Sequence, residues 1–274
     1  MVLALGLLLL TAGGAAGQSW STVHSSRQVG SEDVLDVQVR YGSGQFQMTG
    51  ADTGILYQME LEYDEESFRP ISEYRNGSLS IGVEGTGSRM RFGRNESRGS
   101  MNLRVSRDVP VGLRMEFGAV RATMDLGGLQ LHSLDLSTGA SDADLRVSAP
   151  NPIRLSSARM KVGAASFEAR EMANLNAERL EIDAGVGSLH LDFSGTWSGN
   201  TRAEVKIGMG SLEISVPETV GIRLSRSTFL TSIDAPGLER RGDELLSPNW
   251  EEAEHRLDLH VSAALGSVRI MRVP

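Results

Sequence analysis

The strongest constraint on the fold is a short turn motif that recurs through the second half of the chain. A small residue followed by serine opens a strand-like segment at Ala140-Ser141, Ala165-Ser166, Gly187-Ser188, Gly210-Ser211 and Gly266-Ser267, at intervals of 25, 22, 23 and 56 residues. A period of 22–25 residues made of short strands and glycine corners is typical of a β-solenoid, whose stacked coils bury a shared core. The last interval fits two coils plus an insertion, which we assign to the charged stretch 234–256.

From about residue 34 onward, apolar and polar residues alternate with the period of a half-buried strand. Tyr57, Met59 and Leu61 show this pattern, and so do Leu189 and Leu191. Helix-forming residues gather only at 167–180, which we interpret as strand–turn–strand, and at 249–257, which we expect to be a short helix or loop. The prediction is an all-β chain. A β-sandwich is the competing architecture, although it would not repeat one turn motif so regularly.

A second recurrence supports stacked coils. Asn151, Asn176 and Asn200 each precede a strand-like segment, at intervals of 25 and 24 residues. We expect a ladder of asparagines at a corner of the stack.

The N-terminal stretch VLDVQVRYGSGQFQMTGADTGILYQMELEYDEES resembles the N-terminal module of bacterial toast-rack proteins. The G-x-G-S-[LV]-x-[IL] turns over 111–274 resemble the C-terminal β-solenoid of LiaF, which is related to adhesin-type domains, and RLDLHVSAALGSVRIMRV is similar to its final coil. The resemblance implies a bacterial envelope protein with an adhesin-like or envelope-stress role. It supplies no catalytic residues. Unlike LiaF, this chain has no transmembrane-length apolar run.

The chain divides into four predicted parts. Residues 1–17 read as a signal peptide, because an apolar run too short to span a bilayer is followed by small residues suited to cleavage after Gly17. We expect a linker at 18–29, a toast-rack-like β module at 30–108 and solenoid repeats at 109–274. The mature protein would then be extracytoplasmic, periplasmic or secreted, and would not span the membrane.

The amino-acid composition excludes several classes of partner and site. The chain has 27 Lys and Arg against 35 Asp and Glu, a net charge of −8, which disfavours nucleic acid as a partner. It has no cysteine, which excludes thiol nucleophiles, disulfides and cysteine-ligated metals.

Motifs for catalysis or metal binding are weak. The five histidines form no HExxH or His-x-His motif, and we interpret them as surface residues: His24, His132, His190, His255 and His260. The repeated serines Ser188, Ser211 and Ser267 indicate turn hydrogen bonding, because an active site is normally unique. No Gly-x-Gly turn continues into a phosphate-binding loop.

Outward-facing carboxylates are the main candidates for a metal-binding or catalytic site. Asp142 and Asp144 lie at alternate positions, and Asp125, Asp135 and Asp192 are also predicted to face outward. Stacked aspartates can bind calcium, and paired carboxylates can hydrolyse glycosides. Basic residues nearby favour an ordinary solvated face of mixed charge.

One basic concentration stands out in the acidic chain, at Arg89, Arg91, Arg94, Arg98, Arg104 and Arg107. It could engage an anionic polymer or lipid headgroups, but we favour a hairpin whose charge protects a sheet edge. The sequons at Asn76 and Asn95 are treated as chance.

We therefore assign no catalytic, cofactor-binding or metal-ligating residue, and expect neither a cofactor nor enzymatic activity. The predicted function is a scaffold or binding protein for a cell-envelope polymer or envelope protein, with the 234–256 loop as the contact most able to carry specificity. A carbohydrate-active β-helix enzyme and a self-assembling structural protein are the alternatives.

Overall fold

The computed structural model describes residues 19–86 and 99–274, apart from the side chain of Ala165. In this part of the chain, 17 strands form one continuous hydrogen-bonded sheet, and a single short 3₁₀ helix, η1, lies at Met172–Leu175. The all-β prediction is confirmed. The predicted signal peptide at 1–17 lies outside the described residues. No described helix has the length and apolar character needed to cross a bilayer.

The strands have the following bounds. The N-terminal group comprises β1 (Trp20–Gln28), β2 (Leu35–Gly50), β3 (Ile55–Asp64), β4 (Phe68–Arg75), β5 (Ser78–Gly85) and β6 (Ser100–Val105). The middle group comprises β7 (Pro110–Asp125), β8 (Gln130–Thr138), β9 (Asp142–Arg146), β10 (Ala158–Arg170), β11 (Arg179–Asp192) and β12 (Thr201–Pro217). The last group comprises β13 (Gly221–Thr228), β14 (Thr231–Asp234), β15 (Glu239–Arg241), β16 (Glu244–Leu246) and β17 (Arg256–Val273).

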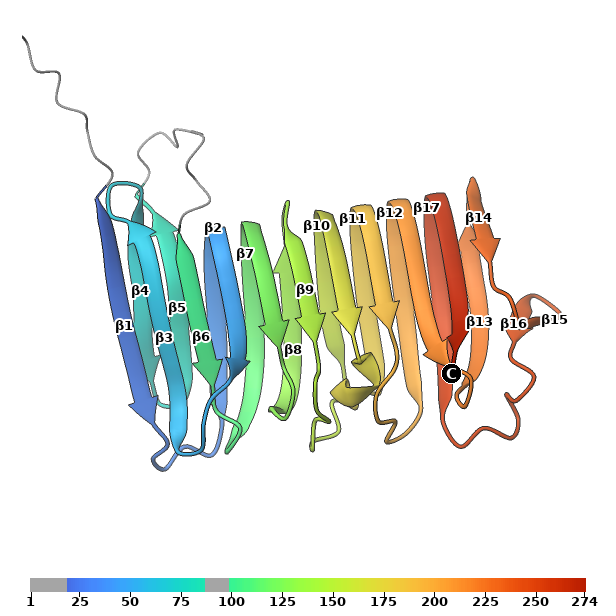
Figure 1. Cartoon of the computed structure of the whole chain (residues 1–274), viewed down its shortest axis with the longest axis horizontal. Helices are drawn as coiled ribbons and strands as arrows, with labels where there is room; N and C mark the ends of the chain where they lie inside the picture. The colour runs from blue at the N-terminus through green and yellow to red at the C-terminus, as the bar shows by residue number, and fades with distance from the viewer. Residues whose placement is uncertain (1–18, 87–98) are drawn as a thin grey trace, which may run out of the picture.

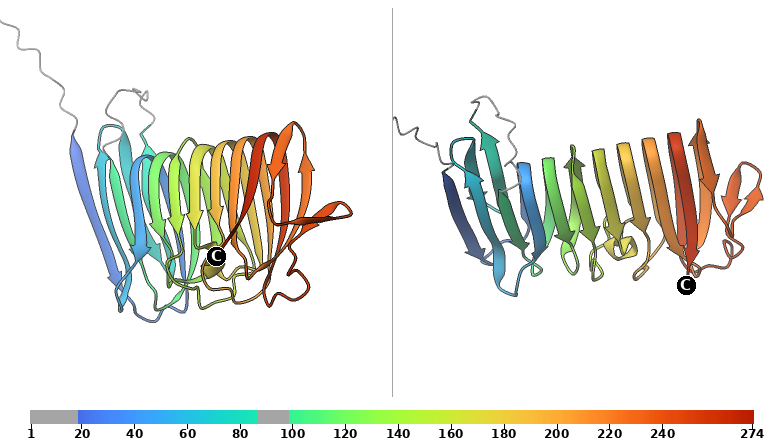
Figure 2. Two further views of the ribbon diagram at one scale, coloured as in Figure 1. Left: turned by 45° about the vertical axis from the view of Figure 1, so that its right-hand side comes forward. Right: turned by 45° about the horizontal axis from the view of Figure 1, so that its top comes forward.

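The long strands stack in parallel and in register, in the spatial order β2, β7, β10, β11, β12 and β17, with the pair β8–β9 between β7 and β10. Each long strand folds over at one edge of the stack, so that its two halves lie in two layers (Figures 1 and 2). We call the N-terminal halves, such as 179–184, the first layer and the C-terminal halves, such as 188–192, the second layer. Apolar side chains of both layers meet between them, where Leu180, Leu191 and Ile214 are 2% exposed or less.

The last two positions of the stack do not follow chain order. β17 lies between β12 and the pair β13–β14, and Gly210 pairs directly with Gly266 across the interval of 56 residues. The interval contains one additional pair of strands, β13 and β14, but the pair forms the end of the stack rather than a step between β12 and β17. The inward side of β17 is apolar from Leu257 to Ile270, as suits an inner position in the stack. Phe229 and Leu230 at the β13–β14 corner are 71% and 70% exposed, as suits its end.

The predicted insertion at 234–256 is more ordered than a loop. β15 and β16 form an antiparallel hairpin, and β16 pairs with β13. Ser247 fastens the segment to β13, since its hydroxyl accepts a hydrogen bond from the backbone N–H of Ile222 at 2.9 Å. The predicted short helix or loop at 249–257 is a hydrogen-bonded turn, and the predicted strand–turn–strand at 167–180 contains η1 as its turn.

The N-terminal strands close the other end of the stack. β2 pairs with β7 on one side and with β5 and β6 on the other, while β3 and β4 run antiparallel to β6 and β5. Strand pairing therefore continues across the division predicted at residue 108. Residues 20–28, predicted to be a linker, form the edge strand β1 against β3. Their sequence looks like a linker because Val23 is their only aliphatic residue, as suits a strand with one solvated edge.

The predicted asparagine ladder takes a different form. The side chain of Asn151 is buried. Its Oδ1 accepts hydrogen bonds from the backbone N–H groups of Leu131 and Ile153, and its Nδ2 donates to the carbonyls of Leu131 and Leu175. These four bonds use all the donors and acceptors of the amide. Asn176 donates to the backbone carbonyls of Asn151 and Ile153, and Asn200 accepts from the backbone N–H of Arg256. Each asparagine thus ties one coil to the backbone of a neighbour.

Glycine is required at the fold-over because neighbouring backbones touch there. Gly210 has φ +137°, and a Cβ on it would lie 1.8 Å from the carbonyl oxygen of Gly187. Gly266 makes the same approach to Gly210. Gly42, at the β2 corner, has open space around its Cβ position.

We expect Gly210→Ala to lower the free energy of unfolding by about 3 kcal/mol or more, because the backbone conformation is strained for any L residue and the clash is with backbone. Gly42→Ala is the matched control and should change it by less than about 0.5 kcal/mol. Urea denaturation of both variants measures the difference. Equal effects would show that the contact between corners does not limit stability.

A carboxyl group anchors the segment between β1 and β2. Glu32 accepts hydrogen bonds from the Tyr74 hydroxyl at 2.8 Å and the Gly30 N–H at 2.6 Å. These bonds, with a further one from Arg27, lower the pKa of Glu32 from 4.5 to about 2. Because the pKa of Glu32 is lower in the folded than in the unfolded protein, its carboxylate stabilises the fold at pH values above the unfolded pKa. This stabilisation is lost as the pH falls through the folded pKa.

We therefore expect Glu32→Gln to be less stable than the native chain at neutral pH, with the difference shrinking between pH 4.5 and pH 2. Urea denaturation midpoints measured across that pH range provide the check. A difference that stays constant with pH would contradict this role for the Glu32 carboxylate.

Candidate functional site

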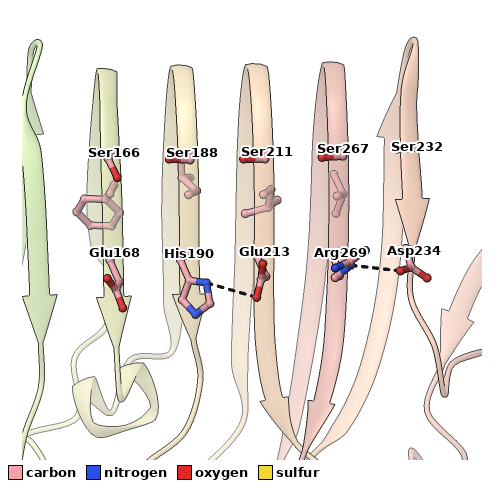
Figure 3. Close-up of a pocket in the computed structure, with 14 residues that line it drawn as sticks. Ser166, Glu168, Ser188, His190, Ser211, Glu213, Ser232, Asp234, Ser267 and Arg269 are labelled. Atoms are coloured by element: carbon pink, nitrogen blue, oxygen red, sulfur yellow. Dashed lines mark ion pairs between the residues drawn. The ribbon is translucent and has the colours of Figure 1, made fainter.

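The most regular polar surface lies on the outer side of the second layer, over β10, β11, β12, β17 and β14. Five serines stand in register across these strands, one per strand: Ser166, Ser188, Ser211, Ser267 and Ser232. Their side chains point outward in one row (Figure 3). We call this row the serine ladder. Neighbouring hydroxyls repeat at the strand spacing, about 4.8 Å.

A second row runs parallel to the first, two residues further along each strand. It consists of Glu168, His190, Glu213, Arg269 and Asp234, which we call the charged ladder (Figure 3). The two ladders line a shallow depression of about 400 Å³. The alternation of strands places this spacing on one face, with Leu189 and Leu212 turned inward between the rows.

The charged ladder is partly neutralised by its own neighbours. His190 Nδ1 lies 3.6 Å from Glu213 Oε1, and Arg269 Nε lies 3.3 Å from Asp234 Oδ2. With three carboxylates and one arginine, and histidine neutral, the row keeps a charge of −2. The side chains in these pairs are 41–62% exposed, so water screens the pairs and they add little stability.

An apolar ridge borders the serine ladder at the fold-over. Val186, Met209 and Leu265 pair in register and are 52%, 49% and 42% exposed, and Phe229 and Leu230 extend the ridge to the end of the stack. The surface therefore has three parallel stripes: the apolar ridge, then the serine ladder, then the charged ladder. All three run across the strands.

Comparison with protein families identifies the chain. The family model described as the N-terminal domain of toast_rack, DUF2154, matches residues 16–168, more than half of the sequence. The chain belongs to the toast-rack family. The model described as cell wall-active antibiotics response LiaF, C-terminal, matches residues 166–270, which include the whole serine ladder. The resemblance seen in the sequence is thus confirmed.

Solved structures similar to this toast-rack protein share little sequence with it. A proposed cell adhesion protein from Clostridium sporogenes is 13% identical, with a TM-score of 0.45 over 93% of this chain and 100% of the other. A proposed adhesin from Bacteroides fragilis is 10% identical, with a TM-score of 0.39 over 92% and 97%. A proposed lipid-binding protein from Parabacteroides distasonis is 13% identical, with a TM-score of 0.35 over 91% and 97%. No curated protein sequence matches the chain.

The predicted histidines lie far apart in the fold. His190 is in the charged ladder, whereas His260 lies on the first layer, with Nδ1 2.8 Å from the Ser225 hydroxyl. His132 Nε2 lies 3.5 Å from Asp36, and His255 Nε2 lies 3.9 Å from Glu254. His24 pairs in register with Glu60 at the edge of the N-terminal strands. Among the described residues, no three His, Asp or Glu side chains gather as a metal site requires.

The predicted aspartates separate into two roles. Asp142 lies 3.9 Å from Arg121 and Asp144 forms an ion pair with Arg170, both on the second layer. Asp135 lies in register with Arg159 on the first layer. Asp125 and Asp192 are turn residues. Asp125 accepts from Gly127 N–H and from Ser148 N–H and Oγ, and Asp192 accepts from Ser194 N–H and Oγ.

Two of the six arginines predicted as a basic concentration lie in the described part of the chain. Arg104 forms an ion pair with Asp52 at 2.9 Å, and Arg107 donates to the carbonyls of Ala51 and Gly127. Both therefore hold strands and turns together. Arg89, Arg91, Arg94 and Arg98 lie outside the described residues, as does the sequon at Asn95. The sequon at Asn76 lies in the β4–β5 turn, where Asn76 and Gly77 both have positive φ.

The serine ladder is visible in part in the sequence, whereas the charged ladder is not. The repeat of Ser188, Ser211 and Ser267 predicts hydrogen bonding in turns, but these side chains point to solvent on the strands. The residue type in the charged ladder changes from each strand to the next, so no letter recurs at successive steps. Its signal is positional, since each member lies two residues after a ladder serine.

We expect the two classes of aspartate to differ in stability measurements. Asp144→Ala removes an exposed ion pair and should lower the free energy of unfolding by less than about 1 kcal/mol. Asp125→Ala removes three hydrogen bonds and should lower it by about 2 kcal/mol or more. Burial opposes ionisation of Asp125, yet the bonds from Ser148 and Gly127 still lower its pKa. Denaturant melts at pH 7 test the ranking, and a larger loss for Asp144→Ala would reverse the assignment.

Proposed function

We propose that this toast-rack protein is a non-enzymatic binding protein of the bacterial cell envelope, and that it binds a neutral, extended, hydroxyl-rich polymer along the serine ladder. The proposal includes the interpretation of the parallel in-register stack as a β-solenoid, exported by a signal peptide at 1–17. Family membership supports the envelope role.

The observation that carries the proposal is the in-register row of five outward hydroxyls. Hydroxyl groups both donate and accept hydrogen bonds, so they match the hydroxyls of a glycan in either direction. A straight row with one hydroxyl at each strand spacing fits a chain molecule lying along the stack better than a compact ligand. The depression is shallow and open, as such a contact requires.

The two stripes beside the serine ladder favour a neutral polymer. Val186, Met209 and Leu265 offer apolar surface to the C–H faces of sugar rings. The charged ladder has a net charge of −2, which repels a polyanion and still supplies carboxylate acceptors to hydroxyl donors. A carbohydrate-active enzyme is less well supported, because Asp142 and Asp144 both face arginines on neighbouring strands.

The test is co-sedimentation of residues 18–274 with insoluble chitin, a neutral N-acetylglucosamine polymer, at low and high salt. We expect binding that persists at high salt, because hydroxyl and apolar contacts are screened little. Ser188→Arg with Ser211→Arg should weaken binding about tenfold or more, by placing long side chains across the row. Ser137→Arg with Ser227→Arg, on the first layer, is the matched control and should leave it unchanged.

Absence of glycan binding by the native protein would overturn the proposal, and so would equal losses in both double variants. Association that depends on protein concentration and on the exposed Phe229–Leu230 end would favour a self-assembling structural protein instead. Circular dichroism melts establish that each double variant is folded before binding is compared.

A further inference from the structure

A separate pocket lies on the first layer, where β11, β12, β17 and β13 meet the turn after β16. Its volume is about 290 Å³, and neither ladder contributes to it. Its lining includes Arg179, Arg202, Arg223, Arg256, Trp250 and Asp258. Four are arginines, in a chain whose net charge is −8.

Strand register brings the arginines together. Arg179 pairs with Arg202 and Arg202 pairs with Asp258, which in turn pairs with Arg223. These residues are 79 positions or less from one another in sequence, but they form one straight row across four strands. Arg256 precedes Asp258 by two residues on the same strand and so faces the same side.

Several contacts hold two of these side chains in place. Arg223 donates two hydrogen bonds to Asp258, from Nε to Oδ1 at 3.2 Å and from Nη2 to Oδ2 at 2.6 Å. Its guanidinium lies 5.1 Å from the centre of the Trp250 ring. Arg256 donates to the carbonyls of Trp250 and Glu251, at 2.8 and 2.9 Å.

The other two arginines are available for a ligand. Arg202 Nε lies 3.5 Å from Asp258, yet its side chain is 70% exposed. Arg179 touches Glu178 at 3.4 Å and is 50% exposed. Each guanidinium carries five N–H donors in a planar fork, so both can turn several donors toward the pocket.

The local charge indicates which ligand fits. Four arginines against Glu178 and Asp258 leave an excess of +2. The hydrogen bonds from Arg223 lower the pKa of Asp258, so this carboxylate stays ionised and keeps the row aligned. A phosphate monoester carries about −1.5 to −2 charges at pH 7 and three acceptor oxygens. It therefore matches the pocket in charge and in its need for several donors.

We infer that this pocket binds a phosphate group, with Arg179 and Arg202 as its principal donors and Arg223, Asp258 and Trp250 as the framework that positions them. The phosphate can belong to a soluble sugar phosphate or to a lipid headgroup. The site is independent of the serine ladder, and it uses the segment after β16 that the sequence indicated as the specific contact.

The experiment titrates residues 18–274 with inorganic phosphate by isothermal calorimetry at about 0.15 M ionic strength, and follows intrinsic tryptophan fluorescence in parallel. We expect saturable binding that weakens at least tenfold in Arg179→Ala with Arg202→Ala, because charge-assisted hydrogen bonds are lost. Arg69→Ala with Arg75→Ala, on β4 at the far end of the molecule, is the matched control and should bind like the native protein. Circular dichroism melts check that both variants are folded.

Sedimentation with vesicles that contain phosphatidic acid, whose headgroup is a phosphate monoester, distinguishes the two sources. Vesicle binding that requires Arg179 and Arg202 assigns the phosphate to lipid, whereas binding of glucose 6-phosphate without vesicle binding assigns it to a soluble ligand. No saturable phosphate binding, or equal binding by both double variants, would overturn the inference. Because glycan binding maps to the opposite layer, either proposal can fail while the other holds.

Discussion

The architecture depends on close contact between the backbones of neighbouring corners. At Gly210 and Gly266, the space that a Cβ would occupy is taken by the carbonyl oxygen of the preceding coil. Because of that contact, each long strand passes from the first layer to the second at the same position as its neighbour in the stack. Because the corners coincide, the register on both sides of them is fixed, and a one-residue slip would turn the buried side chains outward.

Fixed register converts sequence positions into rows on the surface. A residue type kept at one position of the repeat becomes a stripe, as in the serine ladder, and a position that varies becomes a row of mixed charges. Side chains that would be isolated on a single strand, such as Arg179, Arg202 and Arg223, thereby become neighbours. The chemistry of these surfaces is collective, because each strand supplies only a few of the groups on either one.

The sequence predicted the features that are local. Alternation, which is read within a few residues, predicted the all-β class. The repeated Gly-Ser pairs predicted the in-register corners because the same short motif recurs at each corner. The sequence did not predict that β17 enters the stack beside β12, since Gly210 and Gly266 match equally well in either order of coils. The sequence of β1 resembles a linker because an edge strand needs few apolar residues. The charged ladder and the arginine pocket were missed for one reason, namely that their members are neighbours only through strand pairing.

The two layers differ in chemistry, and this difference constrains function more than either surface does alone. The second layer offers hydroxyls, apolar bulk and a charge of −2, whereas the pocket on the first layer has an excess of +2. The two surfaces lie on opposite layers and share no lining residue, so they are not parts of one continuous groove. Their opposite charges suit them to different ligands. A protein with this arrangement can hold a neutral polymer on one side while an anionic group occupies the other. The apolar core between the two layers separates the proposed glycan surface from the proposed phosphate pocket.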